Sequence, residues 1–176
     1  MPRIAPIDPA TATGKAKEIF AGPLAGKHFN IFKSMAASPA VLEVYLGMAG
    51  ALKHAHLSAA EQEVIQLAIG QANNCQYCLS AHTAIGKSVG LSEAQTIAAR
   101  RGSLTDPKHQ ALARFALAIQ EKRGLVSDAD LASFKGAGYT DAHVAEVVAV
   151  YALAVLTNTF NHVNQTAVDF PPAPAI

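Results

Sequence analysis

Helix start and stop signals recur along the whole chain, and they constrain its fold more than any other feature. A Ser followed three residues later by Glu or Gln caps a helix start, and a Gly just past an apolar repeat marks a helix end. Ser58 with Glu61 and Ser92 with Gln95 have the first pattern, and Gly90 has the second. No stretch alternates convincingly as a half-buried strand does. The sequence therefore predicts an all-α protein, a single-domain bundle of about six to eight helices.

The same signals give approximate bounds for seven helices. They are expected over residues 39–52, 58–73, 75–89, 92–102, 106–124, 127–134 and 141–163. The first 35 residues contain Pro6, Pro9 and Pro23, so they are expected to form an irregular arm with one short helix. The proline-rich tail, about 169–176, is expected to be extended. Since no long linker divides the chain, residues 1–176 are predicted to form one domain.

The composition argues against several classes of partner. Charged residues make up 15% of the chain and the formal net charge is +1, so the basic surface that binds nucleic acid is not expected. The N-terminus lacks the apolar core of a secretory signal, and the longest uncharged apolar run, 147–156, is far shorter than the ~20 residues of a membrane span. A cytoplasmic protein without a membrane partner is therefore expected. The positive mean hydropathy of +0.20 favours a homo-oligomer that buries apolar helix surface between subunits.

The two cysteines of the chain, Cys75 and Cys78, are three residues apart. A disulfide between them would close so short a loop that it constrains the unfolded chain little, so a structural role explains the spacing poorly. At a helix start, free N–H groups and the helix dipole stabilise a thiolate, the form that attacks peroxides and disulfides. Lowering a thiol pKa from ~8.5 to ~6.5 raises the thiolate fraction at pH 7 from ~3% to ~75%. The pair therefore predicts a thiol redox site.

A histidine shares the helix face of the two thiols. His82 follows Cys78 by four residues and Cys75 by seven, so it can accept a thiol proton. The same three side chains could also bind zinc, but the sequence offers no obvious fourth ligand. A thioredoxin-like motif would follow a strand, and only helices are expected here. We therefore expect neither a bound metal nor a resident cofactor, only an external dithiol reductant.

Four residues, Glu63, Cys75, Cys78 and His82, resemble the Glu-x11-Cys-x2-Cys-x3-His pattern of the alkylhydroperoxidase D-like (AhpD-like) branch of the carboxymuconolactone decarboxylase superfamily. The resemblance covers about 58–90, and the segment 158–163 also looks like the C-terminal helix of relatives. It implies an all-helical fold and a trimer or hexamer.

The resemblance also implies a role for each residue. It makes Cys78 the thiol that His82 activates, Cys75 its disulfide partner, and Glu63 the carboxylate that completes a proton relay with His82. Without the resemblance, Glu63 is better interpreted as an acid at a helix start, where the dipole favours negative charge. Tyr77 departs from the pattern, because the best-known members carry a histidine there. Such members take electrons from lipoylated partner proteins.

Three functions fit these features. The leading prediction is a thiol-dependent antioxidant enzyme that reduces hydroperoxides through Cys75 and Cys78. A second is a lyase that decarboxylates a lactone acid, a reaction that needs no cysteine. A third is a non-enzymatic helical oligomer with a structural zinc or a redox-sensing cysteine pair.

Overall fold

The computed structural model describes residues 1–176 and contains nine helices and no strand. The helices are α1 (Gly14–Ala21), α2 (Asn30–Met35), α3 (Pro39–Leu52), α4 (Ala59–Ala72), α5 (Gln76–Ser88), α6 (Glu93–Arg101), α7 (Pro107–Lys122), α8 (Asp128–Gly136) and α9 (Asp141–Asn164). The predicted all-α fold is confirmed. The seven expected helices are α3 to α9. Ser58 and Ser92 each form a complete capping box as predicted, whereas the side chain of Ser38 makes no capping hydrogen bond at the start of α3.

The N-terminal arm differs from the expectation of an irregular segment with one short helix, because it forms both α1 and α2. Short helices are stable in a protein when they bury an apolar face. Phe20 of α1 and Phe32 of α2 are both buried, in a second core that also contains Leu42 of α3 and the two cysteines. The prolines of the arm fall outside both helices. The arm is therefore a part of the packed fold.

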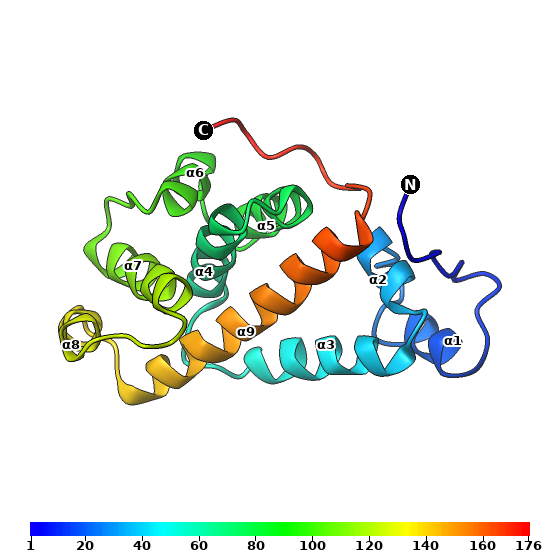
Figure 1. Cartoon of the computed structure of the whole chain (residues 1–176), viewed down its shortest axis with the longest axis horizontal. Helices are drawn as coiled ribbons and strands as arrows, with labels where there is room; N and C mark the ends of the chain where they lie inside the picture. The colour runs from blue at the N-terminus through cyan, green and yellow to red at the C-terminus, as the bar shows by residue number, and fades with distance from the viewer.

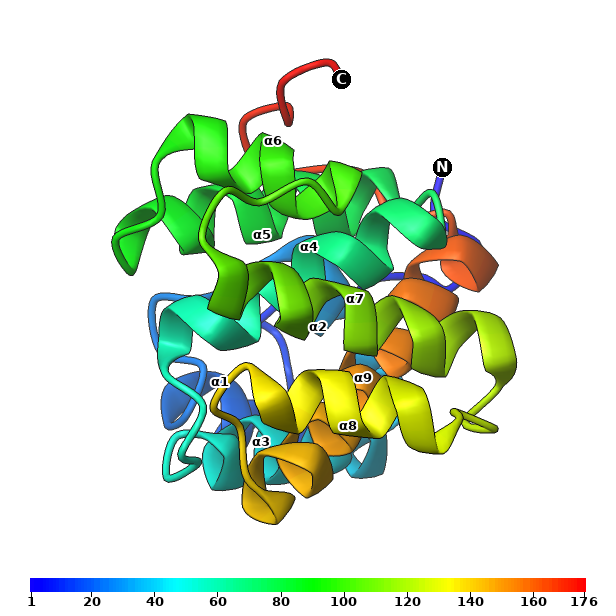
Figure 2. The ribbon, with the colours of Figure 1, turned by 90° about the vertical axis from the view of Figure 1, so that its left-hand side faces the viewer.

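Helix α4 is the centre of the molecule. Its residues are buried almost without interruption from Glu61 to Gly70, and it packs against α5, α6, α7 and α9 (Figure 1). A helix enclosed in this way needs apolar side chains all round, and Val64, Ile65 and Leu67 are fully buried. At one end of the bundle α7 pairs with α8, as Figure 2 shows. The opposite end holds α1 and α2 (Figure 1).

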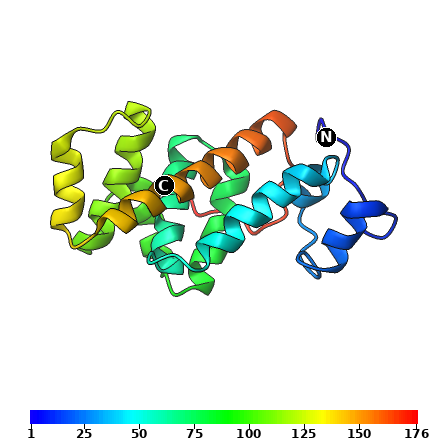
Figure 3. The ribbon, with the colours of Figure 1, turned by 90° about the horizontal axis from the view of Figure 1, so that it is seen from below.

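The long helix α9 runs across the bundle and joins its two cores. It lies beside α3 on one face of the molecule (Figure 3) and also contacts α4, α5 and α7. By length and composition alone α9 could cross a membrane. Its contacts instead make it a central packing element, with Val147, Val150 and Ala154 in the larger core. Beyond α9 the chain continues without helix and passes α5 towards α6 (Figure 1).

Candidate active site

A tight turn between α4 and α5 positions the cysteines. Asn73 caps the end of α4, and Asn74 adopts a left-handed conformation with φ of 52°. Asparagine tolerates this region better than most residues, so the sequence can turn here without a glycine. Cys75 then stands at the N-cap of α5, with its backbone N–H bonded to the carbonyl of Gly70 at 2.9 Å. The predicted break between the helices over 58–73 and 75–89, and the predicted helix start near Cys75, are confirmed.

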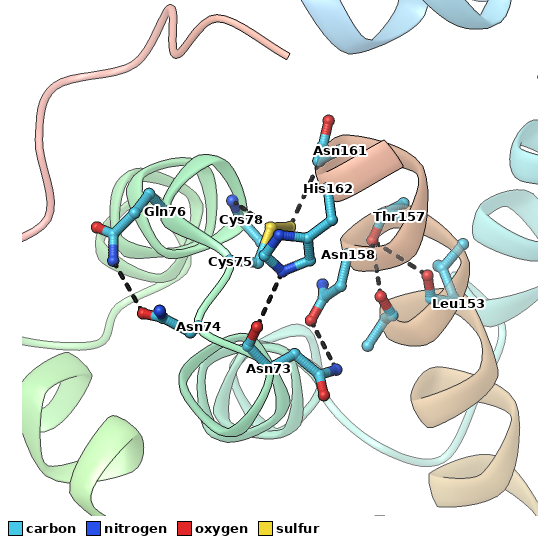
Figure 4. Close-up of a disulfide and its surroundings, with 11 residues drawn as sticks. Asn73, Asn74, Cys75, Gln76, Cys78, Leu153, Thr157, Asn158, Asn161 and His162 are labelled. Carbon is cyan, nitrogen blue, oxygen red and sulfur yellow. Dashed lines mark hydrogen bonds between the residues drawn. A yellow bond between two sulfur atoms is a disulfide. The ribbon is translucent and has the colours of Figure 1, made fainter. Parts of the chain in front are cut away.

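The two cysteines form a disulfide, drawn in Figure 4. Their Cα atoms are 5.3 Å apart, and the Cys75 sulfur also accepts a hydrogen bond from the Cys78 backbone N–H at 3.3 Å. Cys75 therefore occupies the position of a helix cap, where a negative sulfur is stabilised by a free N–H and by the dipole. Only 1% of Cys75 and 2% of Cys78 is exposed. A reactant in solution can therefore reach these residues only if the packing around them opens.

Glu63 and His82 form a second pair, on the facing sides of α4 and α5. His82 Nδ1 lies 2.8 Å from Glu63 Oε2, and the two side chains are 16% and 12% exposed. Burial raises the pKa of Tyr45 on α3, and the nearby charge of Glu63 raises it further. The carboxylate therefore faces the interior of the protein. No hydrogen bond joins this pair to the disulfide, although His82 follows Cys78 by one helical turn.

The C-terminal half of α9 adds a residue that the sequence analysis did not identify. Asn161 Nδ2 donates to the Cys78 sulfur at 3.4 Å (Figure 4). One turn earlier, Asn158 Oδ1 accepts from Asn73 Nδ2 at 3.0 Å, and His162 Nε2 lies 2.9 Å from the Asn73 carbonyl oxygen. The signal was present in the sequence, because polar residues at one helical spacing interrupt an otherwise apolar helix at Thr157, Asn158, Asn161 and Asn164, all of them buried.

Tyr77 connects the redox helix to the C-terminal tail. Its hydroxyl donates to Asp169 Oδ1 at 2.8 Å, and its ring packs edge-on against Phe170. Burial raises the pKa of Tyr77, and the hydrogen bond to Asp169 adds to this shift, so the phenol remains a donor. Asp169 Oδ2 also accepts from the Asn30 backbone N–H, at the start of α2. The tail thereby ties α5 to α2 beside the disulfide.

The four predicted site residues therefore form two pairs. Cys75 meets Cys78, and Glu63 meets His82. No three His, Cys, Asp or Glu side chains lie close enough to hold a metal ion. The site combines a disulfide, an imidazole that contacts a carboxylate, and an amide that donates to sulfur. This arrangement can transfer electrons through the thiols while the imidazole carries protons.

Comparison with known proteins identifies similar chains. Residues 39–121 match the model of the carboxymuconolactone decarboxylase family. The alkylhydroperoxidase AhpD core, an uncharacterised peroxidase-related protein from Ralstonia eutropha JMP134, has a TM-score of 0.84 and 23% identity, over 96% of this chain and 92% of that one. A peroxidase-related protein from Silicibacter sp. TM1040 has a TM-score of 0.81 and 19% identity, over 94% and 91%.

The debrominase Bmp8, solved in complex with 2,3,4-tribromopyrrole, has a TM-score of 0.78 and 17% identity, over 95% and 91% of the two chains. At such low identities these structures establish a shared fold. No protein of curated function matches the chain significantly.

Proposed function

We propose that the chain belongs to the carboxymuconolactone decarboxylase family, whose model matches residues 39–121, on its alkylhydroperoxidase D-like branch, and that it reduces hydroperoxides through Cys75 and Cys78. The observation that carries the proposal is the disulfide at the start of α5, with His82 one turn along the same helix and in contact with Glu63 of α4. A disulfide that spans three residues stabilises a fold little, so its value lies in opening and closing. The apolar surroundings of the sulfur atoms favour a small or apolar peroxide.

The reaction begins with the reduced pair. The Cys78 thiolate attacks the terminal oxygen of the hydroperoxide, so that a sulfur–oxygen bond forms and the oxygen–oxygen bond breaks. The departing alkoxide takes up a proton and leaves as the alcohol. Cys75 then attacks the sulfenic sulfur of Cys78, which closes the disulfide and releases hydroxide, protonated to water. An external dithiol, free or on a lipoylated partner protein, reduces the disulfide and is itself oxidised to a disulfide.

His82 and Glu63 manage the protons in this scheme. His82 accepts the proton of the Cys78 thiol and returns it to the leaving alkoxide. Glu63 holds the imidazole through Nδ1, which leaves Nε2 for the proton transfer, and stabilises the imidazolium that forms. The need for a dithiol reductant fits the cytoplasm, where thiols are kept reduced.

Peroxide consumption with each cysteine replaced by serine tests the proposal. Purified protein with a dithiol such as dihydrolipoamide should consume an alkyl hydroperoxide. Cys78→Ser should reduce turnover to the background rate, whereas Cys75→Ser, assayed without dithiol, should consume one equivalent of peroxide and accumulate the Cys78 sulfenic acid. Mass spectrometry of the wild type should find a loss of two hydrogens confined to the peptide with both cysteines. Wild-type turnover by Cys78→Ser would refute the proposal.

The same variants distinguish peroxide reduction from decarboxylation, the reaction after which the family is named. That reaction needs no thiol, so the double variant Cys75→Ser, Cys78→Ser would retain it. Carboxymuconolactone turnover by the double variant, together with no dithiol-dependent peroxide consumption by the wild type, would assign the chain to the lyases. Near-stoichiometric zinc in protein purified without chelator would likewise defeat the dithiol mechanism.

A further inference from the structure

We propose that Asn161 is a catalytic residue that donates a hydrogen bond to the Cys78 thiolate and thereby makes Cys78, rather than Cys75, the attacking sulfur. This inference depends on the proposed function in one respect, namely that Cys78 is the thiol that attacks the hydroperoxide. Its basis is the 3.4 Å contact from Asn161 Nδ2 to the Cys78 sulfur, made by a side chain that is 5% exposed (Figure 4). The donor comes from α9, 83 residues along the chain from Cys78.

The two sulfur atoms receive different donors. The Cys75 sulfur accepts from the backbone N–H of Cys78 and lies at the positive end of the α5 dipole. If Cys78 had no hydrogen-bond donor of its own, the Cys75 thiolate would be more stable than the Cys78 thiolate. The Asn161 amide gives Cys78 a donor of its own, and hydrogen bonds to an ionised acceptor are about twice as strong as neutral ones. Asn161 therefore has its largest effect when the disulfide is open and Cys78 is negatively charged.

The oxygen atom of the Asn161 amide also supports a catalytic role for this residue. Asn161 Oδ1 is buried and has no hydrogen-bond partner. An unpaired buried acceptor is unfavourable, so an apolar residue would be expected here if packing alone decided the position. The free acceptor lies on the side chain that contacts the Cys78 sulfur, where it can accept a hydrogen bond from the hydroperoxide O–H or from the sulfenic acid.

Other ionisable side chains near α5 do not supply this interaction. They include Tyr77 and His82 on α5, Glu63 on α4, Tyr45 on α3, Arg100 on α6, His162 on α9 and Asp169 in the tail. None of them hydrogen-bonds to either sulfur, and most are engaged elsewhere: His82 with Glu63, Arg100 with Gln71 and the tail, Asp169 with Tyr77. Asn161 makes the one side-chain hydrogen bond to a sulfur atom in the protein. Replacing it leaves these charges in place.

A titration of Cys78 alone tests the inference. In the reduced Cys75→Ser protein Cys78 is the only thiol, so the ultraviolet absorbance of its thiolate reports its pKa directly. Adding Asn161→Ala should raise that pKa by roughly one unit, since a hydrogen bond to a charged group is lost. Asn161→Asp, which keeps the size of the side chain and replaces the donor by a carboxylate, should raise it further. Asn161→Asp also carries the test if Asn161→Ala fails to fold.

Two matched controls distinguish a direct effect of Asn161 on the Cys78 pKa from a general disturbance of the structure around α9. Asn158→Ala, one turn earlier on α9, removes the hydrogen bond to Asn73 without touching sulfur and should leave the Cys78 titration unchanged. Asn161→Ala in the Cys78→Ser background should leave the Cys75 titration unchanged. An unshifted Cys78 titration, or equal shifts of both thiols, would overturn the inference. Because the titration contains no peroxide, its result is independent of whether the protein reduces peroxides.

Discussion

Two buried glutamates on the same helix, Glu61 and Glu63, have different surroundings and different expected effects. Glu61 Oε2 accepts hydrogen bonds from the backbone N–H and the hydroxyl of Ser58, both at 2.8 Å, and its Oε1 accepts from Tyr139 at 3.1 Å. Glu63 contacts His82 instead. From the sequence, Glu61 was predicted to complete a capping box with Ser58, whereas only the family resemblance distinguished Glu63 from an ordinary acid near a helix start. The structure separates a helix-capping acid from an acid that holds the imidazole.

Replacing Glu63 should impair turnover more than stability. Glu63→Gln keeps the size of the side chain but removes the charge that orients and stabilises the His82 imidazolium. We expect dithiol-dependent peroxide turnover to fall by about 10²-fold or more, which is the usual contribution of general acid–base catalysis. Steady-state kinetics and a thermal melt of the same sample measure the two effects. An unchanged kcat would remove Glu63 from the relay.

Replacing Glu61 should instead impair stability more than turnover. Glu61→Ala removes the capping box and leaves the Tyr139 hydroxyl without its carboxylate partner, which should lower the free energy of unfolding by about 2 kcal/mol. Turnover at a temperature where the variant is folded should stay close to that of the wild type. Urea denaturation and the peroxide assay check this pair of outcomes. A large loss of kcat with normal stability would contradict the separation of roles.

At the scale of whole helices, local signals predicted most of the fold. Ser58, Ser92 and Asp106 cap helices through side chains that bond to backbone N–H groups three residues away, so a short stretch of sequence contains the whole interaction. The Cys75 helix start was predictable for the same reason. One short helix was expected in the N-terminal arm, but the pair α1 and α2 was not, because these helices depend on burial in a core that includes α3 and the more distant α5.

The residues of the candidate site likewise differ in whether a short stretch of sequence could predict them. Cys75, Cys78 and His82 lie within one helix and its cap, so their spacing revealed them. The contact between Glu63 and His82 required the family resemblance, since it joins two helices. Asn161 and Asp169 reach the site from 83 and 92 residues away, and no local pattern specifies which side chain they meet.

The contact of the tail with α2 yields a prediction for these elements. Asp169→Ala should free both the Asn30 N–H and the Tyr77 hydroxyl, so α2 and the tail should exchange their amide hydrogens faster. The disulfide should then be reduced more rapidly by a bulky thiol, because its cover is looser. Val168→Ala, at an exposed neighbouring position, is the matched control. Equal rates of amide exchange and of disulfide reduction in the two variants would show that Asp169 does not hold the C-terminal tail in place beside the disulfide.

At the scale of the whole molecule, acid should destabilise the fold. Burial opposes ionisation of Glu146, but hydrogen bonds from His56 and Leu57 outweigh it, so the Glu146 pKa lies below its ordinary value of 4.5. The Glu61 pKa is lowered against burial as well, by Ser58 and Tyr139. Carboxyls with a depressed folded-state pKa stabilise the protein above the unfolded-state pKa, and this contribution is lost as the pH falls through the folded-state value.

Stability should therefore be constant near neutral pH and decrease below about pH 4.5. Glu146→Gln should be less stable near neutral pH but lose less stability on acidification, because the group no longer titrates. Urea denaturation at a series of pH values measures both slopes. Parallel curves for the wild type and the variant would show that Glu146 does not contribute to the pH dependence.

Apolar surface on α3 supports the expected homo-oligomer. This helix has a single charged residue, Glu43, and its Val44 is 53% exposed in the single chain. We expect a trimer or hexamer in which this surface is covered by another copy. Val44→Glu should shift the mass measured by light scattering towards the monomer, whereas Leu125→Glu, at an exposed loop position, should not. A monomeric wild type would refute the expectation.

The Asn161 and Asp169 contacts also determine when the site can be completed during synthesis. A ribosome adds roughly 5–20 residues per second, so Asn161 is made on the order of ten seconds after Cys78. During that interval both cysteines have left the peptidyl-transferase centre without the amide that contacts Cys78 or the tail that covers α5. A nascent chain that ends before α9 is therefore expected to expose a dithiol that reacts like ordinary free cysteines. On the proposed mechanism, Cys78 acquires its distinctive reactivity only when α9 is in place.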